Sequence, residues 1–311
     1  MLAVTFLVLD YIKIVAQYHR EKHKNNFLLN NNMCKLFIII IAYVLLIAAA
    51  TSSVNSISNI QKINEGEINQ KRGKHQCVTS VRIGTSPAAG TLLPCPWKEA
   101  ESFYFVFDPQ QMDTIRAHGW TPVLLNVLDI PFDPLQGPTE MPELGWTTAD
   151  TENMQAKYVK ILSHMIAELR GCELVLYLDS KISLTFAQVR GLFDRFEAES
   201  NPNTCAALFQ HQRTYYGAYF QEVDDSYRQP RYLRFKPAID KEIAFHRGRQ
   251  ESFDGVMHVG NMHIFNLTNT QAVQFQKSWW KETVAYSIQD QLSQFWQLEP
   301  FKDCLLSWKG V

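Results

Sequence analysis

The run of residues 173–178 (ELVLYL) constrains the fold of this chain more than any other feature. After one charged residue it contains only apolar and aromatic side chains. A strand with one face in water alternates polar and apolar residues, whereas a short continuous apolar run is typical of a strand covered on both faces. Such strands lie in parallel sheets that carry helices on both sides. The run therefore predicts the centre of an α/β sheet.

The chain after residue 76 carries a matching pattern. Short apolar runs alternate with stretches of helical periodicity, which is typical of a mostly parallel sheet flanked by helices. The proline-rich residues 128–149 predict a loop, and residues 212–252 show no clear pattern. Because no linker interrupts residues 76–311, we expect a single domain there. Strands are predicted at residues 103–107, 122–127, 206–209 and 255–265, and helices at 150–169, 186–198, 271–285 and 288–298.

The N-terminal part differs from the rest of the chain. Residues 36–50 (LFIIIIAYVLLIAAA) carry no charge. This run is shorter than the about 17–25 apolar residues that a membrane span needs, so we extend the predicted helix to residues 33–54. The polar residues 55–75 that follow predict a stem or linker.

The charges around this segment predict its orientation. Basic residues lie before it, and the first charge after it is Lys62. This asymmetry predicts a cytosolic segment 1–32, a signal anchor and a lumenal remainder, that is, a type II protein of the Golgi or another secretory membrane. The alternative is a signal peptide that begins at Met33 and is cleaved near Ala50, which would give a secreted protein.

The composition is that of a globular protein with a large core. Of the 311 residues, 46% are hydrophobic and 20% are charged, and the formal net charge is −1. The chain has no excess of basic residues, so its charge does not indicate a nucleic-acid partner. It has no excess of acidic residues either, so its charge does not indicate a disordered acidic segment. We therefore expect no nucleic acid among the partners.

Five cysteines follow the apolar segment, and none has the spacing of metal ligands. An odd number leaves at least one thiol free. Cys77 and Cys95 bracket a loop rich in glycine, proline and serine, so we expect a disulfide between these two. A glycosylation triplet begins at Asn266, although such triplets often arise by chance. The five cysteines are Cys77, Cys95, Cys172, Cys205 and Cys304.

Asp179 follows the buried run directly and is the first candidate for chemistry. In open parallel sheets, ligands bind beyond the carboxyl ends of the strands. A carboxylate there can hold a divalent cation that binds a diphosphate, or accept hydrogen bonds from a ribose. Lys181 offers an ammonium that would stabilise a departing nucleoside diphosphate. An aspartate at a strand end often only caps a turn, so this pattern by itself leaves both interpretations open.

Around these residues the chain resembles the glycosyltransferase-like domain of the plant turgor-regulation-defect and mucilage-related proteins. The family motif W-x-D-G-K-x-Q-L corresponds to residues 177–184, and its S-x-R-D-Q-L-S block corresponds to residues 287–293. The resemblance covers residues 100–300 and includes the family pattern K-x-x-K-x-x-x-H at Lys157, Lys160 and His164. A histidine in a similar context corresponds to His211. The chain departs from the family at Ser180, Ser183 and Gln289, where the family has glycine, glutamine and arginine.

The resemblance implies a GT-A-like (Rossmann-like) fold and a glycosyltransferase activity. The enzyme would move a hexosyl or related sugar from a nucleotide-activated donor to a glycan or glycoprotein acceptor. The resemblance assigns catalysis to Asp290 and Lys181. It assigns donor binding to five further residues, namely Asp179, Lys157, Lys160, His211 and Gln291.

Two alternatives follow from the departures. Many GT-A enzymes hold manganese with a D-x-D motif, but Lys181 stands here in place of the second acid. We expect either Mn²⁺ or Mg²⁺ at Asp179, or a metal-independent site where Lys181 meets the diphosphate. The changes at Ser180 and Gln289 leave open a second function, a membrane-bound carbohydrate-binding protein that keeps the fold without catalysis. A hydrolase of the nucleophile-elbow type is not indicated, because the chain lacks the G-x-S-x-G motif.

Overall fold

The computed structural model describes residues 74–82, 92–97, 101–126, 130–211 and 218–309. The chain divides into two compact units, Met1–Arg72 and Gly73–Val311, and all described residues belong to the second. The cytosolic segment 1–32, the anchor 33–54 and nearly all of the stem 55–75 lie outside the described residues. None of the helices in those residues is long and apolar enough to span a membrane.

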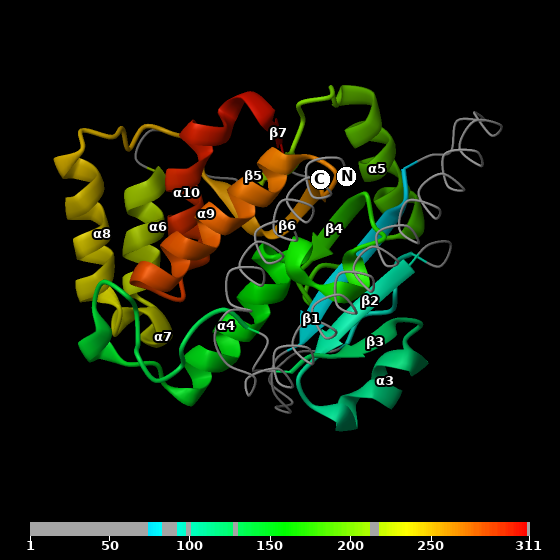
Figure 1. Cartoon of the computed structure of the whole chain (residues 1–311), viewed down its shortest axis with the longest axis horizontal. Helices are drawn as coiled ribbons and strands as arrows, with labels where there is room; N and C mark the ends of the chain where they lie inside the picture. Colours follow the sequence, from blue (N-terminus) through cyan, green and yellow to red (C-terminus); the bar gives the residue numbers. More distant parts are fainter. Residues whose placement is uncertain (1–73, 83–91, 98–100, 127–129, 212–217, 310–311) are drawn as a thin grey trace, which may run out of the picture. The chain divides into compact units, whose positions relative to one another are not determined.

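A seven-stranded sheet forms the centre of this unit, in the order β3-β2-β1-β4-β6-β5-β7 (Figure 1). β1 pairs in parallel with β2 and β4, β2 with β3, and β5 with β7, while β6 is antiparallel to both β4 and β5. The predicted mostly parallel sheet is therefore confirmed. The strands are β1 (Gln76–Arg82), β2 (Glu101–Val106), β3 (Thr121–Leu124), β4 (Leu174–Leu178), β5 (Ala206–Gln210), β6 (His258–Asn266) and β7 (Leu305–Trp308).

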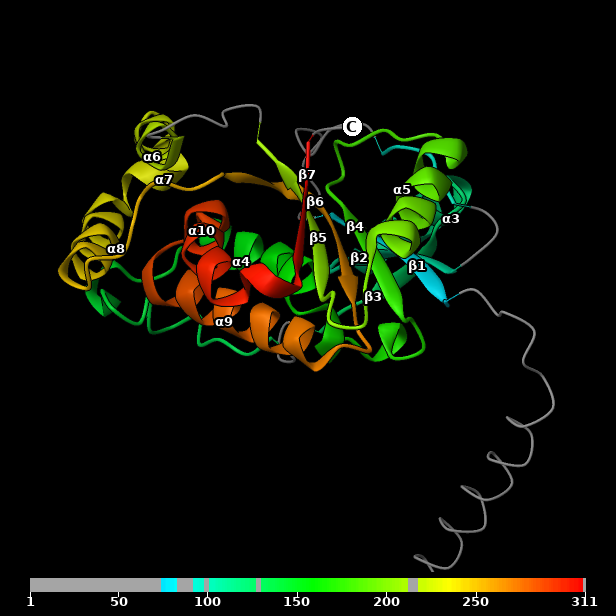
Figure 2. The ribbon, with the colours of Figure 1, turned by 90° about the horizontal axis from the view of Figure 1, so that it is seen from above.

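Helices cover both faces of the sheet, which gives three layers. α4, α9 and α10 lie on one side and α3 and α5 on the other (Figure 2). The unassigned residues 212–252 contain the helices α6, α7 and α8 in full, and these lie farther from the sheet on the side of α10 (Figure 2). The helices are α3 (Met112–Ala117), α4 (Thr148–Ile161), α5 (Phe186–Glu199), α6 (Ala218–Tyr227), α7 (Pro230–Leu233), α8 (Lys236–Gly248), α9 (Thr270–Tyr286) and α10 (Asp290–Phe301).

β4 occupies the central place that its sequence predicts. All five of its residues are buried. Leu174, Leu176 and Leu178 pack into the core with α3 and α5, whereas Val175 and Tyr177 pack into the core with α4, α9 and α10. Alternate side chains of a strand point to opposite faces, so a strand between two helical layers has no polar face.

β1 was not predicted, although it is as central as β4. Its sequence, QCVTSVR, contains the polar residues Thr79 and Ser80, which give the pattern of a half-buried strand. Both are nevertheless buried, and Thr79 Oγ1 donates a hydrogen bond to the Leu176 carbonyl at 3.5 Å. The predicted helix 150–169 is also shorter than expected. It ends at Ile161, because Leu162 leaves the helical conformation with φ −105° and ψ 39°.

The predicted disulfide between Cys77 and Cys95 is wrong. The bonds are Cys77–Cys172 and Cys205–Cys304, and Cys95 is a buried free thiol. Each bond joins the beginnings of two neighbouring parallel strands, β1 with β4 and β5 with β7. Such pairs are far apart in sequence, so local loop composition could not reveal them.

The glycosylation triplet does not present an accessible amide. Asn266 ends β6 and is 5% exposed. Its side-chain amide donates a hydrogen bond to the Thr204 carbonyl at 3.0 Å. In the folded domain this amide therefore holds the turn before β5, and the triplet gives no support for a surface glycan.

Truncation of Leu176 to alanine tests the central position of β4. Leu176 is fully buried, so Leu176→Ala should leave a cavity and lower the free energy of unfolding by about 2–5 kcal/mol. Leu135→Ala is the matched control, because Leu135 is 90% exposed and its truncation removes almost no packing. Urea denaturation of both variants measures the difference. Equal stabilities would show that β4 lies at the periphery.

Candidate active site

A cavity of about 480 Å³ opens at the carboxyl edge of the sheet. Arg82 ends β1, Asp179 follows β4 and His211 follows β5, and all three line it. Because β6 is antiparallel, its first half reaches the same edge, and the Asp179 amide donates to the Asn261 carbonyl at 2.8 Å. The chain proceeds from β1 to β2 on one side and from β4 towards β5 on the other. The cavity therefore lies at a topological switch point, where open α/β sheets bind ligands.

All seven residues predicted for the site line this one cavity. They come from four separate parts of the chain, namely α4, the ends of β4 and β5, and the start of α10. Their juxtaposition is a finding of the structure, whereas their individual roles remain predictions. The seven are Lys157, Lys160, Asp179, Lys181, His211, Asp290 and Gln291.

Asp290 is the most deeply placed charge of the cavity. It is the first residue of α10, is 2% exposed and forms ion pairs with the ammonium groups of Lys157 and Lys160. The two lysines are three residues apart on α4 and so share one helix face. The indole nitrogen of Trp279 donates to the Asp290 carbonyl at 2.7 Å and fixes the start of α10.

The ion pairs determine the pKa of the Asp290 carboxyl. Burial by itself would raise the pKa of this carboxyl, but the charges of Lys157 and Lys160 outweigh burial and lower the pKa to about 2. An effective general base has a pKa near the working pH, so Asp290 is poorly suited to that role. Its pairing also occupies Lys157 and Lys160, which sequence reasoning treated as contacts of the donor.

The ion pairs of Asp290 lie against Gly260 of β6, which leaves space for them because it has no side chain. A Cβ atom on Gly260 would lie 2.6 Å from Lys160 Nζ and 3.3 Å from Asp290 Oδ2. Lys160 is 7% exposed, and burial lowers the pKa of its ammonium, opposed by the charge of Asp290. Beneath it, His263 Nε2 is 2.9 Å from the Lys160 carbonyl. Burial and the nearby Lys160 charge lower the pKa of His263 to about 3, so the imidazole is neutral at physiological pH.

Three basic side chains of the cavity have no acidic partner among the described residues, namely Arg82, Lys181 and Arg231. The buried Nε of Arg82 lacks a hydrogen-bond acceptor. The Arg231 guanidinium lies over the Tyr232 ring at 4.4 Å and donates to Gln229. Asp179 forms no ion pair there either, and its Oδ1 accepts from Ser180 Oγ at 3.4 Å. The arrangement combines an excess of free positive charge with one available carboxylate, which suits a polyanion that also carries hydroxyl groups.

Two glutamines at the start of α10 behave differently. The Gln289 amide donates to Glu222 Oε1 at 3.1 Å and Ser226 Oγ at 2.8 Å, which ties α10 to α6. Gln289, at the position where the resembled plant family has arginine, thus has an internal partner. The Gln291 amide nitrogen is buried without an acceptor and faces the cavity, so it is available to a ligand.

Two other histidines do not belong to the site. His164, part of the lysine–histidine pattern on α4, pairs through Nδ1 with the Gln276 side chain at 2.7 Å. His258 Nε2 lies 2.7 Å from Ser307 Oγ and joins β6 to β7. Neither lines the cavity.

Several residues of the cavity were missed by sequence reasoning. Arg82 is the last residue of an unpredicted strand, and its place could have been found only from a correct assignment of β1. Arg231 and Tyr232 lie in the unassigned part of the chain, where no pattern indicated them. Gly260 and Asn261 belong to the predicted strand 255–265, but the antiparallel direction that brings them to the cavity was not anticipated.

The described residues of the cavity do not form a metal site in which protein side chains supply all the ligands. In the described part of the chain, no group of three potential metal ligands includes Asp179. Asp290 is paired with two lysines, and Lys181 stands in place of a second acid. A Mn²⁺ or Mg²⁺ ion at Asp179 would take its other ligands from phosphate and water, as magnesium often does.

No protein-family model matches the chain, and no curated protein matches its sequence. The resemblance to the plant family therefore remains a prediction. The structure is similar to that of mouse xyloside xylosyltransferase 1 in its apo form, with 10% identity, coverage of 75% of this chain and 84% of that chain, and a TM-score of 0.42.

Two fungal structures are similar to a comparable degree. The mannosyltransferase Ktr4p from S. cerevisiae has 9% identity, coverage of 75% of this chain and 68% of that chain, and a TM-score of 0.41. Core-mannan synthase A (CmsA/Ktr4) from Aspergillus fumigatus, in its Mn/GDP form, has 10% identity, coverage of 78% and 74%, and a TM-score of 0.42. All three TM-scores lie below 0.5, so we draw nothing about the activity of this chain from them.

Asp290→Asn tests the ion-pair cluster through its effect on stability. Removing one partner of a buried pair leaves buried charge without compensation, so unfolding free energy at pH 7 should fall by about 3–5 kcal/mol. The folded-state pKa of Asp290 lies below its ordinary value of 3.8. The stabilisation by the carboxylate is therefore complete above about pH 4 and is lost as the pH falls towards 2, a change of about 2 kcal/mol.

Urea denaturation between pH 3 and pH 7 measures this effect. The difference between wild type and Asp290→Asn should narrow as the pH falls. Asp113→Asn is the control, because the Asp113 side chain is 94% exposed and its ion pair with Arg116 contributes little. A difference that stays constant over this range would contradict the low pKa of Asp290.

Proposed function

We propose that this chain is a glycosyltransferase of the secretory pathway, which transfers a sugar from a nucleotide-activated donor to a glycan or glycoprotein acceptor. One observation carries the proposal. The cavity at the switch point combines Arg82, Lys181 and Arg231, which have no acidic partner among the described residues, with Asp179, which forms no ion pair among them. A nucleoside diphosphate sugar has the matching chemistry, since it is a polyanion flanked by two sets of hydroxyl groups.

The size of the cavity supports this assignment. About 480 Å³ lies within the range of about 300–1,000 Å³ that is usual for small-molecule sites. The mostly polar lining also suits a sugar nucleotide better than an apolar ligand. Arg82 and Lys181 bind the diphosphate, and Asp179 accepts hydrogen bonds from the ribose or the sugar.

Lys181 acts on the leaving group. As the bond between the sugar and the diphosphate breaks, negative charge grows on the departing phosphate oxygen. A fixed ammonium beside that oxygen stabilises the transition state more than the ground state, which accelerates the chemical step. Asp290, Lys157 and Lys160 form the floor of the cavity, and their charges compensate each other. The hydrogen-bonding atoms of this floor that the ion pairs leave free bind sugar hydroxyls. The bond between the anomeric carbon and the diphosphate oxygen breaks and a bond to the acceptor oxygen forms, while the proton of the acceptor hydroxyl passes to the departing diphosphate.

The compartment belongs to the same proposal. Two disulfides hold the domain, and such bonds persist in oxidising compartments. This supports a lumenal catalytic domain behind the N-terminal anchor at residues 33–54, in a type II arrangement in the Golgi or a related membrane.

The function is tested by incubating the purified protein with a panel of nucleotide sugars, with and without Mn²⁺, and measuring the release of nucleoside diphosphate. Lys181→Ala should lower kcat for the active donor by about 100-fold while changing the Kd of the donor far less. Lys277→Ala is the matched control, because Lys277 is exposed on α9 and does not line the cavity.

The outcomes separate the two functions that the sequence left open. Release of a nucleoside diphosphate from one donor, with the loss in Lys181→Ala, supports the transferase. Tight binding of a nucleotide sugar without any turnover would instead indicate a carbohydrate-binding protein that keeps the fold. An equal loss of kcat in both lysine variants would refute the role of Lys181.

A further inference from the structure

A second cluster of ligating side chains lies away from the cavity, between α8 and α9. Glu242 and His246 are one helical turn apart on α8, and Glu282 faces them from α9. One ligand atom from each of the three lies within 4.8 Å of the others. Glu242 and His246 are buried, and the Glu282 side chain is 17% exposed, which leaves a route to solvent.

His246 is held in a single orientation. Its ring stacks on Trp296 with ring centroids 3.8 Å apart and an angle of 7° between the planes. Nδ1 forms a hydrogen bond with Glu251 Oε2, and Nε2 lies 2.9 Å from Glu282 Oε1. When Nδ1 donates its proton to Glu251, the lone pair of Nε2 points towards Glu282. A carboxylate behind a histidine is the usual arrangement that orients a metal-binding imidazole.

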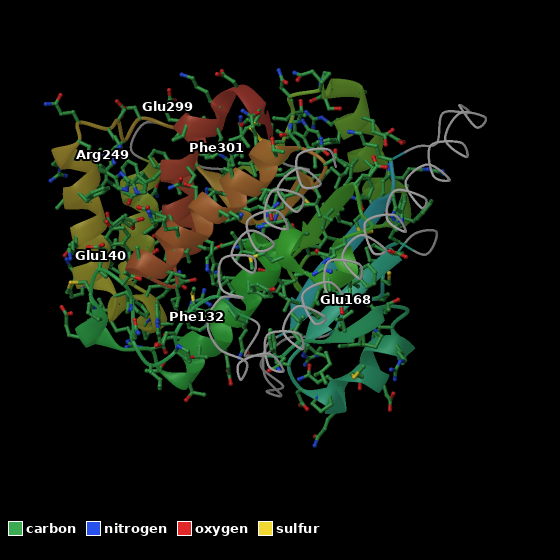
Figure 3. All side chains as sticks on the ribbon, in the orientation of Figure 1. Phe132, Glu140, Glu168, Arg249, Glu299 and Phe301 are labelled. Carbon is green, nitrogen blue, oxygen red and sulfur yellow. A yellow bond between two sulfur atoms is a disulfide. The ribbon has the colours of Figure 1, made fainter. Side chains whose placement is uncertain are left out.

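Glu251 is suited to this supporting position, because its own charge is compensated. Its second oxygen, Oε1, forms an ion pair with Arg249 at 2.8 Å. Arg249 is labelled in Figure 3 near the end of α8, on the outer side of the domain. Glu251 therefore spans from an exposed arginine to the buried imidazole.

Glu242 is the observation that points to a ligand. It is fully buried, and its Oε2 has no hydrogen-bond partner. Its Oε1 accepts only a long hydrogen bond from Ser293 Oγ at 3.5 Å. Burial and the neighbouring Glu282 raise its pKa well above the ordinary value, and no ion pair in the described residues compensates it. A buried carboxylate without a partner is costly, so a positive charge or a proton has to reach this position.

We propose that Glu242, His246 and Glu282 form a binding site for a divalent transition-metal ion, with Zn²⁺ as the preferred ion and Glu251 as the residue that orients His246. One imidazole nitrogen and two carboxylate oxygens are ligands that Zn²⁺ accepts, with a fourth position for water. The imidazole nitrogen disfavours Ca²⁺ and Mg²⁺, which prefer oxygen ligands. The two carboxylates neutralise the ion, and the ion satisfies Glu242 Oε2.

The site would brace the helical layer that carries Asp290. Its ligands join α8 to α9, and its neighbours Ser293 and Trp296 belong to α10, the helix that begins at Asp290. None of the three ligands lines the cavity, so this ion is separate from any metal at the donor site. The inference therefore does not depend on the proposed function.

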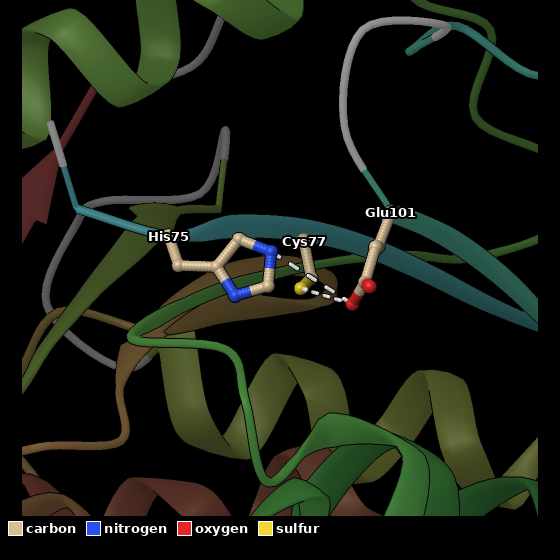
Figure 4. A group of neighbouring side chains, drawn as sticks. All are labelled: His75, Cys77 and Glu101. Atoms are coloured by element: carbon tan, nitrogen blue, oxygen red, sulfur yellow. Dashed lines mark hydrogen bonds and ion pairs between the residues drawn. The ribbon is translucent and has the colours of Figure 1, made fainter. Parts of the chain in front are cut away.

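The other cluster of potential ligands carries no site. Figure 4 shows His75, Cys77 and Glu101 side by side at the beginnings of β1 and β2. The Cys77 sulfur is bonded to Cys172, so it has no thiolate to offer a metal. His75 and Glu101 are left with a contact of 3.8 Å between exposed side chains.

The test uses the full-length protein after treatment with a chelator. Calorimetric titration with Zn²⁺ should show one ion bound per chain, and saturating Zn²⁺ should raise the Tm by about 5–10 °C. Glu242→Gln should abolish both effects, and Glu251→Gln should weaken Zn²⁺ binding about 10–100-fold. Glu168→Gln is the control, because Glu168 is exposed and remote from the cluster (Figure 3), and it should respond to Zn²⁺ like the wild type.

A second readout does not depend on any variant. Co²⁺ bound to the wild type in place of Zn²⁺ should give visible absorption bands that Zn²⁺ removes by competition. Absence of these bands, or of Zn²⁺ binding to the wild type, would overturn the proposal. So would unchanged Zn²⁺ binding by Glu242→Gln. If Glu242→Gln has the same Tm as the wild type, and Zn²⁺ does not change the Tm of the wild type, protons alone neutralise the cluster.

Discussion

The buried ion pairs of Asp290 with Lys157 and Lys160 are the interaction on which the candidate site depends. They join the first residue of α10 to one face of α4, and Gly260 of β6 leaves the space for them. Trp279 of α9 fixes the same residue through its carbonyl. Since each charge is nearly shielded from water, loss of one would leave the others uncompensated. The pairs therefore join α10 to α4 and form the floor of the cavity, against Gly260 of β6.

The charged side chains of the cavity fall into two groups, those paired with each other in this floor and those without an acidic partner among the described residues. Asp290 and its lysines compensate each other and hold the shape of the pocket. Arg82 and Lys181 have no acidic partner in the described residues and face the space above, beside the available carboxylate of Asp179. Positive charges of this second kind are available to stabilise a negative charge on a ligand. Gln289 belongs to neither group, because its amide donates to Glu222 and Ser226 of α6.

The sequence predicted those parts of the fold that are locally patterned. β4 was found because both of its faces are apolar, and Asp179 was found because it ends that strand. β1 was missed because its buried Thr79 and Ser80 imitate a half-exposed strand. The wrong pairing of Cys77 followed from the same cause, since only strand order shows that β1 adjoins β4. The partners of Asp290 lie more than a hundred residues away, and no local rule connects such positions. The sequence therefore indicated Asp290, Lys157 and Lys160 as candidate site residues, but it did not indicate that they form ion pairs with each other.

The most direct test of the account is a crystal structure of the protein with a bound nucleoside diphosphate. The account predicts a diphosphate in the cavity, with phosphate oxygens about 3 Å from Lys181 Nζ and from the Arg82 guanidinium. The ion pairs of Asp290 with Lys157 and Lys160 should stay intact beneath it. A nucleotide bound outside this cavity, or bound within it through Lys157 and Lys160 after these pairs have opened, would contradict the account.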